Sequence, residues 1–274
     1  MHSRIADELR LATRPVALLW SDELPENALQ FKPGRWGCVM MYAAQAATRG
    51  AVAVFDRETY GCWGGGVGLG FGNCYTAFPG GEPCFDRFLS TGNRGDAAGE
   101  AVAEQLKPYI TSEFHDDLIE GERYLATPAH VREFVEQLPM REVPTRYVVL
   151  KPLEALDEAR ETPVNVTFFV TPHQLSALTV LANHTSPAGD RVAMPYAAAC
   201  QVMGIVAYRE GDREPQRAVV GMTDLSARKN TRGPLGDGLL SFTVPLAMLR
   251  TMEDAVATSF LMRPVWQKLA DTQP

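Results

Sequence analysis

The sequence predicts an α+β (mixed α/β) protein, a single compact domain over residues 1–274 in which helices pack on a mixed β-sheet. Two observations predict this class. Short apolar runs that are typical of buried strands alternate along the chain with segments of helical spacing. Apolar residues make up 46% of the 274 residues and charged residues 22%, as in an ordinary globular chain long enough to bury a large core.

In the first part of the chain, helices are expected at 3–12 and 38–48 and strands at 15–20 and 51–55. The strands are continuous apolar runs of strand length, and the helices carry apolar residues three and four positions apart. The second helix is followed by Gly50, a residue type that commonly ends helices. The stretch 61–72 contains seven glycines, so we expect it to be irregular.

Further along, helices are expected at 97–107, at 128–138 and after Thr171, and strands at 146–150, 164–170, 191–194, 218–221 and 239–244. Thr127 and Thr171 each precede a proline, the arrangement of an N-cap followed by proline in the first helical turn. The polar segment 221–238, between the last two strands, is expected to be a loop.

The order strand, helix, strand, cysteine, glycine occurs twice, and PVALLW at 15–20 resembles PVNVTFFV at 163–170. An internal duplication, with halves over 1–125 and 140–260, is the favoured explanation. It would place Cys62 and Cys200 across a pseudo-twofold axis. Chance similarity of two ordinary strand–helix–strand stretches is the alternative.

Charge and hydropathy limit the partners and the compartment. The net charge of −7 and a pI near 5.3 argue against a nucleic-acid partner, which would require a clustered basic face. The most apolar run, 192–208, is interrupted by polar and helix-breaking residues and is shorter than the roughly 20 residues of a membrane-spanning helix. Asp7 and Glu8 interrupt the N-terminus where an export signal would be apolar. We therefore expect a cytoplasmic protein with reduced thiols and a small-molecule substrate, and leave a homo-oligomer open.

Three of the five cysteines are candidate metal ligands. Cys62 and Cys200 each follow an apolar run and are followed four residues later by glycine, and Cys38 opens the predicted helix at 38–48. Thiols at the joints between elements suit a soft metal or an iron–sulfur cluster. A cysteine at a helix start is favoured as a thiolate by the orphan N–H groups there.

The residues beside Cys62 could help to hold such a group. Backbone N–H groups of Gly64, Gly65 and Gly66 can bond cluster sulfides, and Trp63 and Trp36 could screen the site from water. The alternative is structural: free cysteine is among the most buried residue types, and no C-x-x-C pair is present.

The other motifs give weaker signals of function. The glycine run is not read as a nucleotide loop, because a proline–glycine–glycine turn at 79–81 follows it and no helix is expected there. Cys74 and Cys84 are expected in an exposed loop as spare thiols, although a fourth ligand or a redox pair is the alternative. The five histidines form no ligand pair.

The polar segment 221–238 contains three basic residues that could hold a carboxylate or phosphate. We expect Arg228 to reach the cysteines and orient an anionic substrate. Arg35, which lies just before the first of these cysteines, is the competing candidate. A solvated turn with ordinary salt bridges is the alternative.

Several short motifs, in this order, resemble the family called domain of unknown function 169. They are Arg14-Pro15-Val16-Ala17, Cys38 with Ala43 and Ala44, Cys62-x-Gly64-Gly65, Gly68-Leu69-Gly70, Cys200, Gly221-x-x-Asp224-x-x-Ala227-Arg228 and Phe242-x-Val244-Pro245. The resemblance runs from about residue 5 to 260 and includes the three candidate ligands, whereas the region 73–95 looks peculiar to this chain. These prokaryotic proteins are common in anaerobes and have no settled biochemical role, so the resemblance favours a metal site and names no substrate.

The leading hypothesis is a 4Fe-4S cluster held by three cysteines, with one iron open for lyase, hydratase or sulfur-removal chemistry on a small, anionic molecule. An enzyme is therefore favoured. One alternative is a non-enzymatic electron carrier or redox sensor with a closed fourth position. Another is a small-anion binding module whose cysteines are buried and structural.

Overall fold

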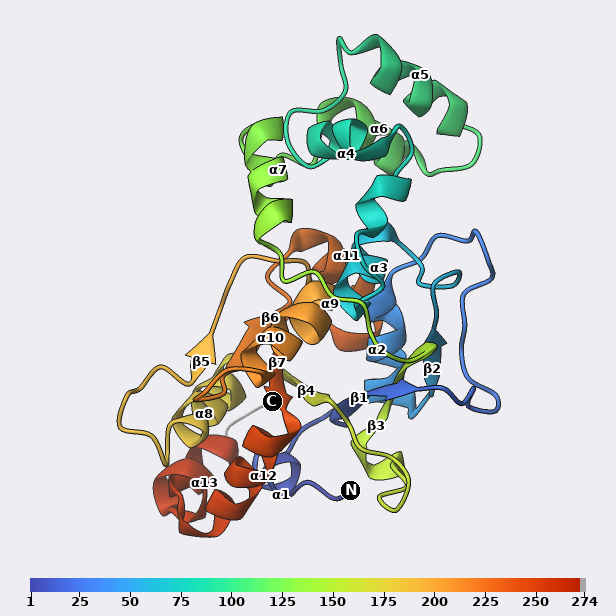
Figure 1. Ribbon diagram of the computed structural model, residues 1–274. Helices are drawn as coiled ribbons and strands as arrows, with labels where there is room; N and C mark the ends of the chain where they lie inside the picture. The colour runs from blue at the N-terminus through green and yellow to red at the C-terminus, as the bar shows by residue number, and fades with distance from the viewer. Residues whose placement is uncertain (272–274) are drawn as a thin grey trace. The chain divides into compact units, whose positions relative to one another are not determined.

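A seven-stranded mixed β-sheet forms the centre of the larger part of the chain, in a computed structural model that describes residues 1–271 (Figure 1). The strands are β1 (Val16–Ser21), β2 (Ala53–Phe55), β3 (Tyr147–Pro152), β4 (Asn165–Val170), β5 (Val192–Ala193), β6 (Ala218–Gly221) and β7 (Leu240–Pro245). Their order in the sheet is β2-β3-β1-β4-β7-β6-β5. Neighbouring strands are antiparallel except for the edge pair β5 and β6, which is parallel. The predicted α+β class with a mixed sheet is confirmed.

The chain divides into two compact units. One consists of Met1–Phe71 with Arg141–Pro274 and contains the sheet, and we call it the sheet unit. The other is Gly72–Met140, an insertion between β2 and β3 that contains only helices among its regular elements, and we call it the helical unit. This division does not coincide with the predicted halves, because the insertion begins inside the first half and extends to the start of the second.

The sheet unit has helices on both faces of its sheet (Figure 1). Its helices are α1 (Arg4–Glu8), α2 (Val39–Arg49), α3 (Trp63–Leu69), α8 (Pro172–Ala182), α9 (Ala199–Gln201), α10 (Ala207–Gly211), α11 (Leu225–Leu235), α12 (Leu246–Ala255) and α13 (Pro264–Asp271). A π-helical turn, η3 (Val202–Val206), joins α9 to α10. Short 3-10 turns are η2 (Leu153–Ala155), η4 (Val256–Thr258) and η5 (Phe260–Met262). In residues 1–271 no helix is both long enough and apolar enough to span a membrane.

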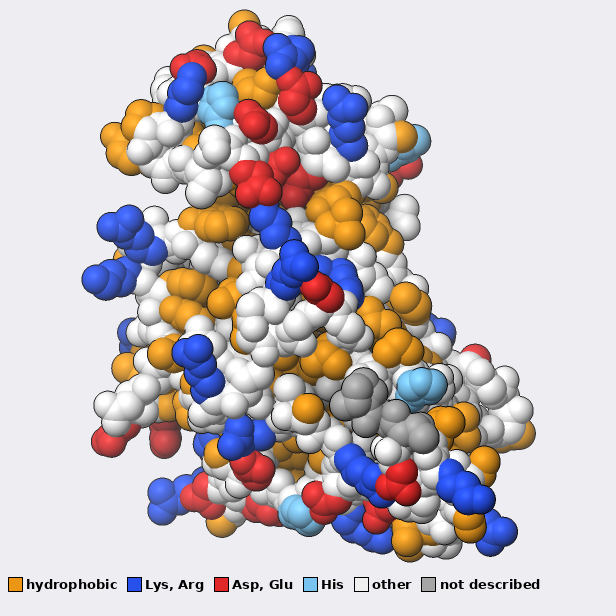
Figure 2. Space-filling model, turned by 180° about the vertical axis from the view of Figure 1, so that it is seen from behind, with side chains coloured by type: hydrophobic (Ala, Val, Ile, Leu, Met, Phe, Trp, Pro, Cys, Tyr) orange, Lys and Arg blue, Asp and Glu red, His pale blue; other side chains and the backbone are white. Residues whose placement is uncertain are grey.

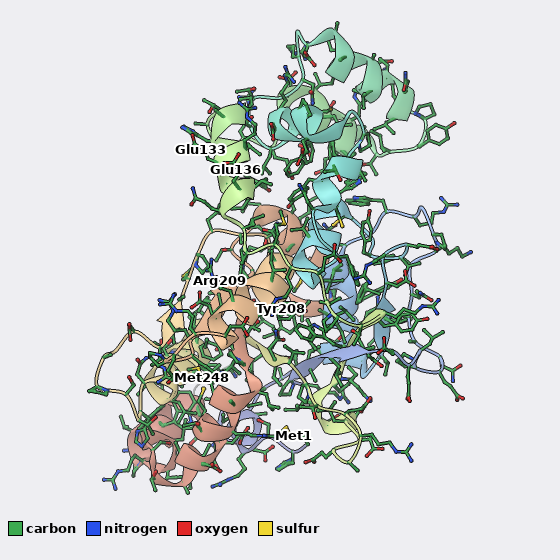
Figure 3. The ribbon with its side chains drawn as sticks, viewed as in Figure 1. Met1, Glu133, Glu136, Tyr208, Arg209 and Met248 are labelled. Carbon is green, nitrogen blue, oxygen red and sulfur yellow. The ribbon has the colours of Figure 1, made fainter. Side chains whose placement is uncertain are left out.

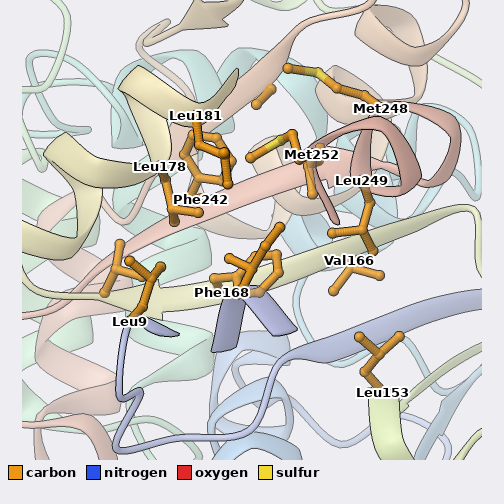
Figure 4. Close-up of a cluster of buried hydrophobic side chains, with 14 of the residues drawn as sticks. Leu9, Leu153, Val166, Phe168, Leu178, Leu181, Phe242, Met248, Leu249 and Met252 are labelled. Atoms are coloured by element: carbon orange, nitrogen blue, oxygen red, sulfur yellow. The ribbon is translucent and has the colours of Figure 1, made fainter. Parts of the chain in front are cut away.

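One face of the sheet carries the main hydrophobic core, and we call it the core face. Alternate residues of the central strands point to it, among them Val166 and Phe168 on β4 and Phe242 and Val244 on β7, all fully buried. Side chains from α8 and α12 pack against them (Figure 4), and side chains from α1 and α13 belong to the same core. Burial of this large apolar area is the main stabilising contribution to the fold.

The other residues of the same strands point to the opposite face, where buried polar groups occur. The Asn165 side chain donates a hydrogen bond to the backbone oxygen of Met203 in η3 (2.9 Å), and the hydroxyls of Thr167 and Thr243 lie 2.9 Å apart. Helix α2 and turn η3 lie on this face, and α11 and α3 pack against them respectively. These four elements position the candidate ligands.

The helical unit has its own aromatic core. Its elements are η1 (Cys74–Ala77), α4 (Gly81–Phe88), α5 (Ala97–Leu106), α6 (Ser112–Glu120) and α7 (Pro128–Gln137). The rings of Tyr75 and Phe85 stack with centroids 4.0 Å apart, and Phe78 and Phe88 join this cluster. Cys74 and Cys84 are buried within this unit, so the expectation that they are exposed spare thiols was wrong.

Most predicted elements are confirmed within a few residues, including the N-caps Thr127 and Thr171. Three segments differ. The glycine-rich stretch contains α3, the segment expected to be a polar loop contains α11, and helix α4 follows the 79–81 turn. Helices α6, α9, α10, α12 and α13 lie in segments for which no helix was expected. On the face shown in Figure 2, basic and acidic side chains are interspersed.

Candidate functional site

Each of the three candidate cysteines lies at the start of a helix in the sheet unit. Cys38 is the N-cap residue of α2. Cys62 is the N-cap residue of α3, and its sulfur accepts a hydrogen bond from the backbone N–H of Gly65 at 3.2 Å. Cys200 is the middle residue of the short helix α9. The backbone N–H groups at helix starts lack partners within the helix, so all three sulfurs lie where hydrogen-bond donors are concentrated.

The first turn of α3 brings the three cysteines together. The thiol of Cys200 donates a hydrogen bond to the backbone oxygen of Gly64 at 3.2 Å. A Cβ added to Gly65 would lie 2.6 Å from Val39, the residue after Cys38, and 3.4 Å from the sulfur of Cys62. Besides burial, Cys62 and Cys38 raise the pKa of Cys200, and Cys38 raises that of Cys62. Residues far apart in the sequence therefore form one group of thiols.

Close backbone contact explains why a glycine-rich segment is helical here. A Cβ on Gly68 would lie 2.6 Å from the backbone carbon of Cys200, and one on Gly204 would lie 1.9 Å from the backbone oxygen of Gly68. Helix α3 thus packs directly against the backbone of α9 and η3. Glycine is unfavourable in helices by about 1 kcal/mol relative to alanine, but here it permits an approach that no other residue allows.

Burial determines the protonation of the thiols. It raises the pKa of Cys62 to about 12, and it raises the pKa of Cys38 and, by a wide margin, that of Cys200. The backbone amides of Met40 and Met41 lower the pKa of Cys38, but burial has the larger effect. The expectation that the helix start makes Cys38 a thiolate is therefore wrong for the metal-free protein, because desolvation of a charged sulfur outweighs the helix-start N–H groups.

Two residues of α11 join the site that sequence reasoning did not assign to it. Asp224 is the N-cap residue of α11 and accepts a hydrogen bond from the backbone N–H of Ala227 at 2.9 Å. Its other oxygen accepts one from the backbone N–H of Ala199 at 2.8 Å, directly before Cys200. The side chain of Asn230, further along α11, lowers the pKa of Cys38. Aspartate is a preferred N-cap residue, so Asp224 itself was the available signal for a helix start here.

The two predicted catalytic arginines are placed differently from each other. Arg228 donates hydrogen bonds to the backbone oxygens of Met222, Leu239 and Asp237, which flank α11 in the chain. This arrangement gives its guanidinium a structural role in holding both ends of that segment. Arg35 is exposed at the surface. Binding of a substrate by either arginine stays a prediction.

The predicted cofactor-binding residues occupy the first turn of α3. Trp63, Gly64, Gly65 and Gly66 are consecutive residues of that helix, and the two cysteine contacts described above fall on Gly64 and Gly65. Trp63 is half-buried, whereas Trp36 is 55% exposed. A contribution of these residues to cofactor binding is still a prediction.

Comparison with protein families assigns the chain. Residues 4–255 match the family domain of unknown function 169, described as "Uncharacterised ArCR". The chain belongs to this family. Comparison with curated proteins gave no significant match, and comparison with solved structures gave none either. The resemblance inferred from the motifs is thus confirmed, and the function must be argued from the site.

The candidate ligand atoms of this site are the three cysteine sulfurs. In residues 1–271 no group of three or more His, Cys, Asp or Glu side chains is placed so that it could hold a metal ion. A cluster differs from a single ion in this respect, because its irons and sulfides lie between the protein ligands and hold those ligands further apart. Three grouped thiols from separate segments, with the Gly65 N–H group directed at one of them, fit the ligand chemistry of an iron–sulfur cluster.

Proposed function

We propose that this protein is an iron–sulfur protein in which Cys38, Cys62 and Cys200 hold a 4Fe-4S cluster and leave one iron without a protein thiolate. The observation that carries the proposal is the grouping of three thiols, each at a helix start, around the first turn of α3. Merely structural cysteines have no reason to share one place from three separate segments.

The surrounding residues support anionic sulfur at this place. The N–H of Gly65 is directed at the sulfur of Cys62, and the backbone amides of Met40 and Met41 and the side chain of Asn230 lower the pKa of Cys38. Hydrogen bonds to ligand sulfurs are a general means of stabilising clusters and setting their potential. The thiol protons, including the one that Cys200 donates to Gly64, must leave when the sulfurs become ligands.

When bound, a cluster of this kind supplies a Lewis-acidic iron that a small oxygen- or sulfur-containing molecule can bind. The helix starts around the site hold the thiolates and shield them from water. Because Arg228 is engaged by backbone oxygens, Arg35 is the other candidate for binding an anionic group. We propose lyase, hydratase or sulfur-removal chemistry on a small anionic substrate in the cytoplasm. None of the five cysteines, all of which lie within residues 1–271, forms a disulfide, which is consistent with a reducing compartment.

Anaerobic purification tests the open site. The protein, reconstituted with iron and sulfide, is expected to show visible absorption. After one-electron reduction with dithionite it should show an electron paramagnetic resonance signal that changes when cyanide or citrate is added, because these ligands bind an iron that lacks a thiolate. A spectrum that is insensitive to both ligands would favour a non-enzymatic electron carrier in which the fourth iron also has a protein ligand. A colourless, iron-free protein would contradict the proposal.

A further inference from the structure

The sheet repeats its pairing pattern on either side of the central antiparallel pair β1 and β4. Strand β3 is antiparallel to β1, and β2 is antiparallel to β3. On the other side, β7 is antiparallel to β4, and β6 is antiparallel to β7. The strands β1, β2 and β3 therefore correspond, in chain order and in sheet order, to β4, β6 and β7. Strand β5 lies outside this correspondence at the edge.

The helices on the opposite face follow the same correspondence. Cys38 starts α2, between β1 and β2, and Cys200 starts the run from α9 to α10, between β4 and β6. Helix α3 follows β2, and α11 follows β6. Helix α2 packs against α11, and the run from α9 to α10 packs against α3 through α9 and η3, which is the exchange of partners that a pseudo-twofold axis requires.

We propose that Asp224 holds the place of a fourth cysteine in this site, as the counterpart of Cys62. Both residues are N-caps with extended backbones, at φ −100° and ψ 162° for Cys62 and φ −83° and ψ 141° for Asp224. Each side chain accepts a hydrogen bond from the backbone N–H three residues later, on Gly65 and on Ala227. This pairs Cys38 with Cys200, and it replaces the pairing of Cys62 with Cys200 that was expected from the sequence.

The position of Asp224 agrees with this assignment. Its two oxygens accept hydrogen bonds from the starts of two helices, at Ala199 and Ala227. A carboxylate fixed in this way positions the backbone of Cys200 and leaves the fourth place without a thiolate. Asp224 is thus a positioning residue, and the inference rests on the proposed function.

The variant Asp224→Cys tests the assignment in the cluster-loaded protein. Ferricyanide removes one electron from a 4Fe-4S cluster and becomes ferrocyanide, and an iron without a protein thiolate then leaves as a ferrous ion. The unaltered protein is expected to yield the electron paramagnetic resonance signal of a three-iron cluster. Asp224→Cys, which supplies a fourth thiolate, should keep about four irons and show little of that signal. Asp224→Ser is the matched control, because it retains one capping oxygen and supplies no thiol. It loses the second hydrogen bond, as Asp224→Cys does, but the cluster that it holds should still give the three-iron signal.

An exchange of the two residues gives a second test that a loss of stability cannot imitate. Cys62→Asp alone is expected to lose the cluster, and the double variant Cys62→Asp/Asp224→Cys is expected to recover it, because three thiolates are again present. A double variant as free of iron as Cys62→Asp would overturn the inference. So would a three-iron signal of equal strength in Asp224→Cys and the unaltered protein. An unaltered protein that takes up no cluster would overturn the proposed function itself, so the two failures are distinguishable.

Discussion

The two faces of the sheet are built from neighbouring residues of the same strands, yet they differ in the side chains that they present and in how helices approach them. On the core face, Phe168 and Phe242 pack against apolar side chains from the surrounding helices. On the opposite face, the same strands present Thr167 and Thr243, whose hydroxyls pair with each other, and helices approach through glycine backbone. The comparison indicates that stability resides mainly on one face and the positioning of the thiols on the other.

The largest expected effect is on the core face. Phe168→Ala should lower the free energy of unfolding by about 3–5 kcal/mol, because it removes a fully buried ring and leaves a cavity. Urea unfolding followed by circular dichroism measures this change. Tyr109→Ala is the control, since Tyr109 is 85% exposed and should change little. A loss below about 1 kcal/mol in Phe168→Ala would mean that this face does not dominate stability.

The second prediction concerns the glycine contact on the opposite face. Gly204→Ala places a methyl group 1.9 Å from the backbone oxygen of Gly68, so α3 must move away from η3. We expect a loss of about 3 kcal/mol in unfolding free energy, and a cluster content reduced beyond what Phe168→Ala produces at equal folded fraction. Gly233→Ala is the matched control. It lies in α11 with nothing within 4 Å and should be neutral or stabilising by up to about 1 kcal/mol.

Equal behaviour of the two glycine variants would contradict the close packing of α3 on η3. A Gly204→Ala protein that unfolds more easily but still binds a full complement of iron would show that the packing of α3 on η3 is not needed to position the thiols. Iron analysis and urea unfolding on the same samples distinguish these outcomes.

The smallest predicted effect tests an ion pair on α10. Glu210 is fully buried and accepts hydrogen bonds from Arg217 at 2.7 Å and Arg209 at 3.0 Å; Figure 3 labels Arg209. Burial raises the pKa of Glu210, but the two arginines together outweigh it and lower the pKa below the ordinary 4.5. The carboxylate therefore contributes stability above about pH 4.5, and this contribution is lost as the pH falls through the lowered folded-state pKa.

Glu210→Gln should consequently cost about 1.5 kcal/mol at pH 7 and progressively less in acid. Urea unfolding across this pH range measures the difference, with the exposed Glu136→Gln as control. A cost that is independent of pH would show that packing rather than charge is responsible.

Much of the fold could be predicted from the sequence, because its signals are local. Apolar runs predicted most strands, and Thr127 and Thr171 with their following prolines predicted two helix starts. Helix α3 could not be predicted, since glycine disfavours a helix locally and only the tertiary contact between Gly68 and Gly204 explains it. In the candidate site, the cysteines were recognisable by type and position. The link from Asp224 to Ala199 depends on two segments meeting in space.

The most direct test of the account is the iron and sulfide content of single cysteine variants after anaerobic reconstitution. Cys38→Ala, Cys62→Ala and Cys200→Ala should each fall well below the about four irons and four sulfides per chain expected of the unaltered protein. Cys74→Ala and Cys84→Ala, which alter buried thiols of the helical unit, should retain the full content if they remain folded. Full iron content in any of the first three variants, or no iron in the unaltered protein, would contradict the three-cysteine site.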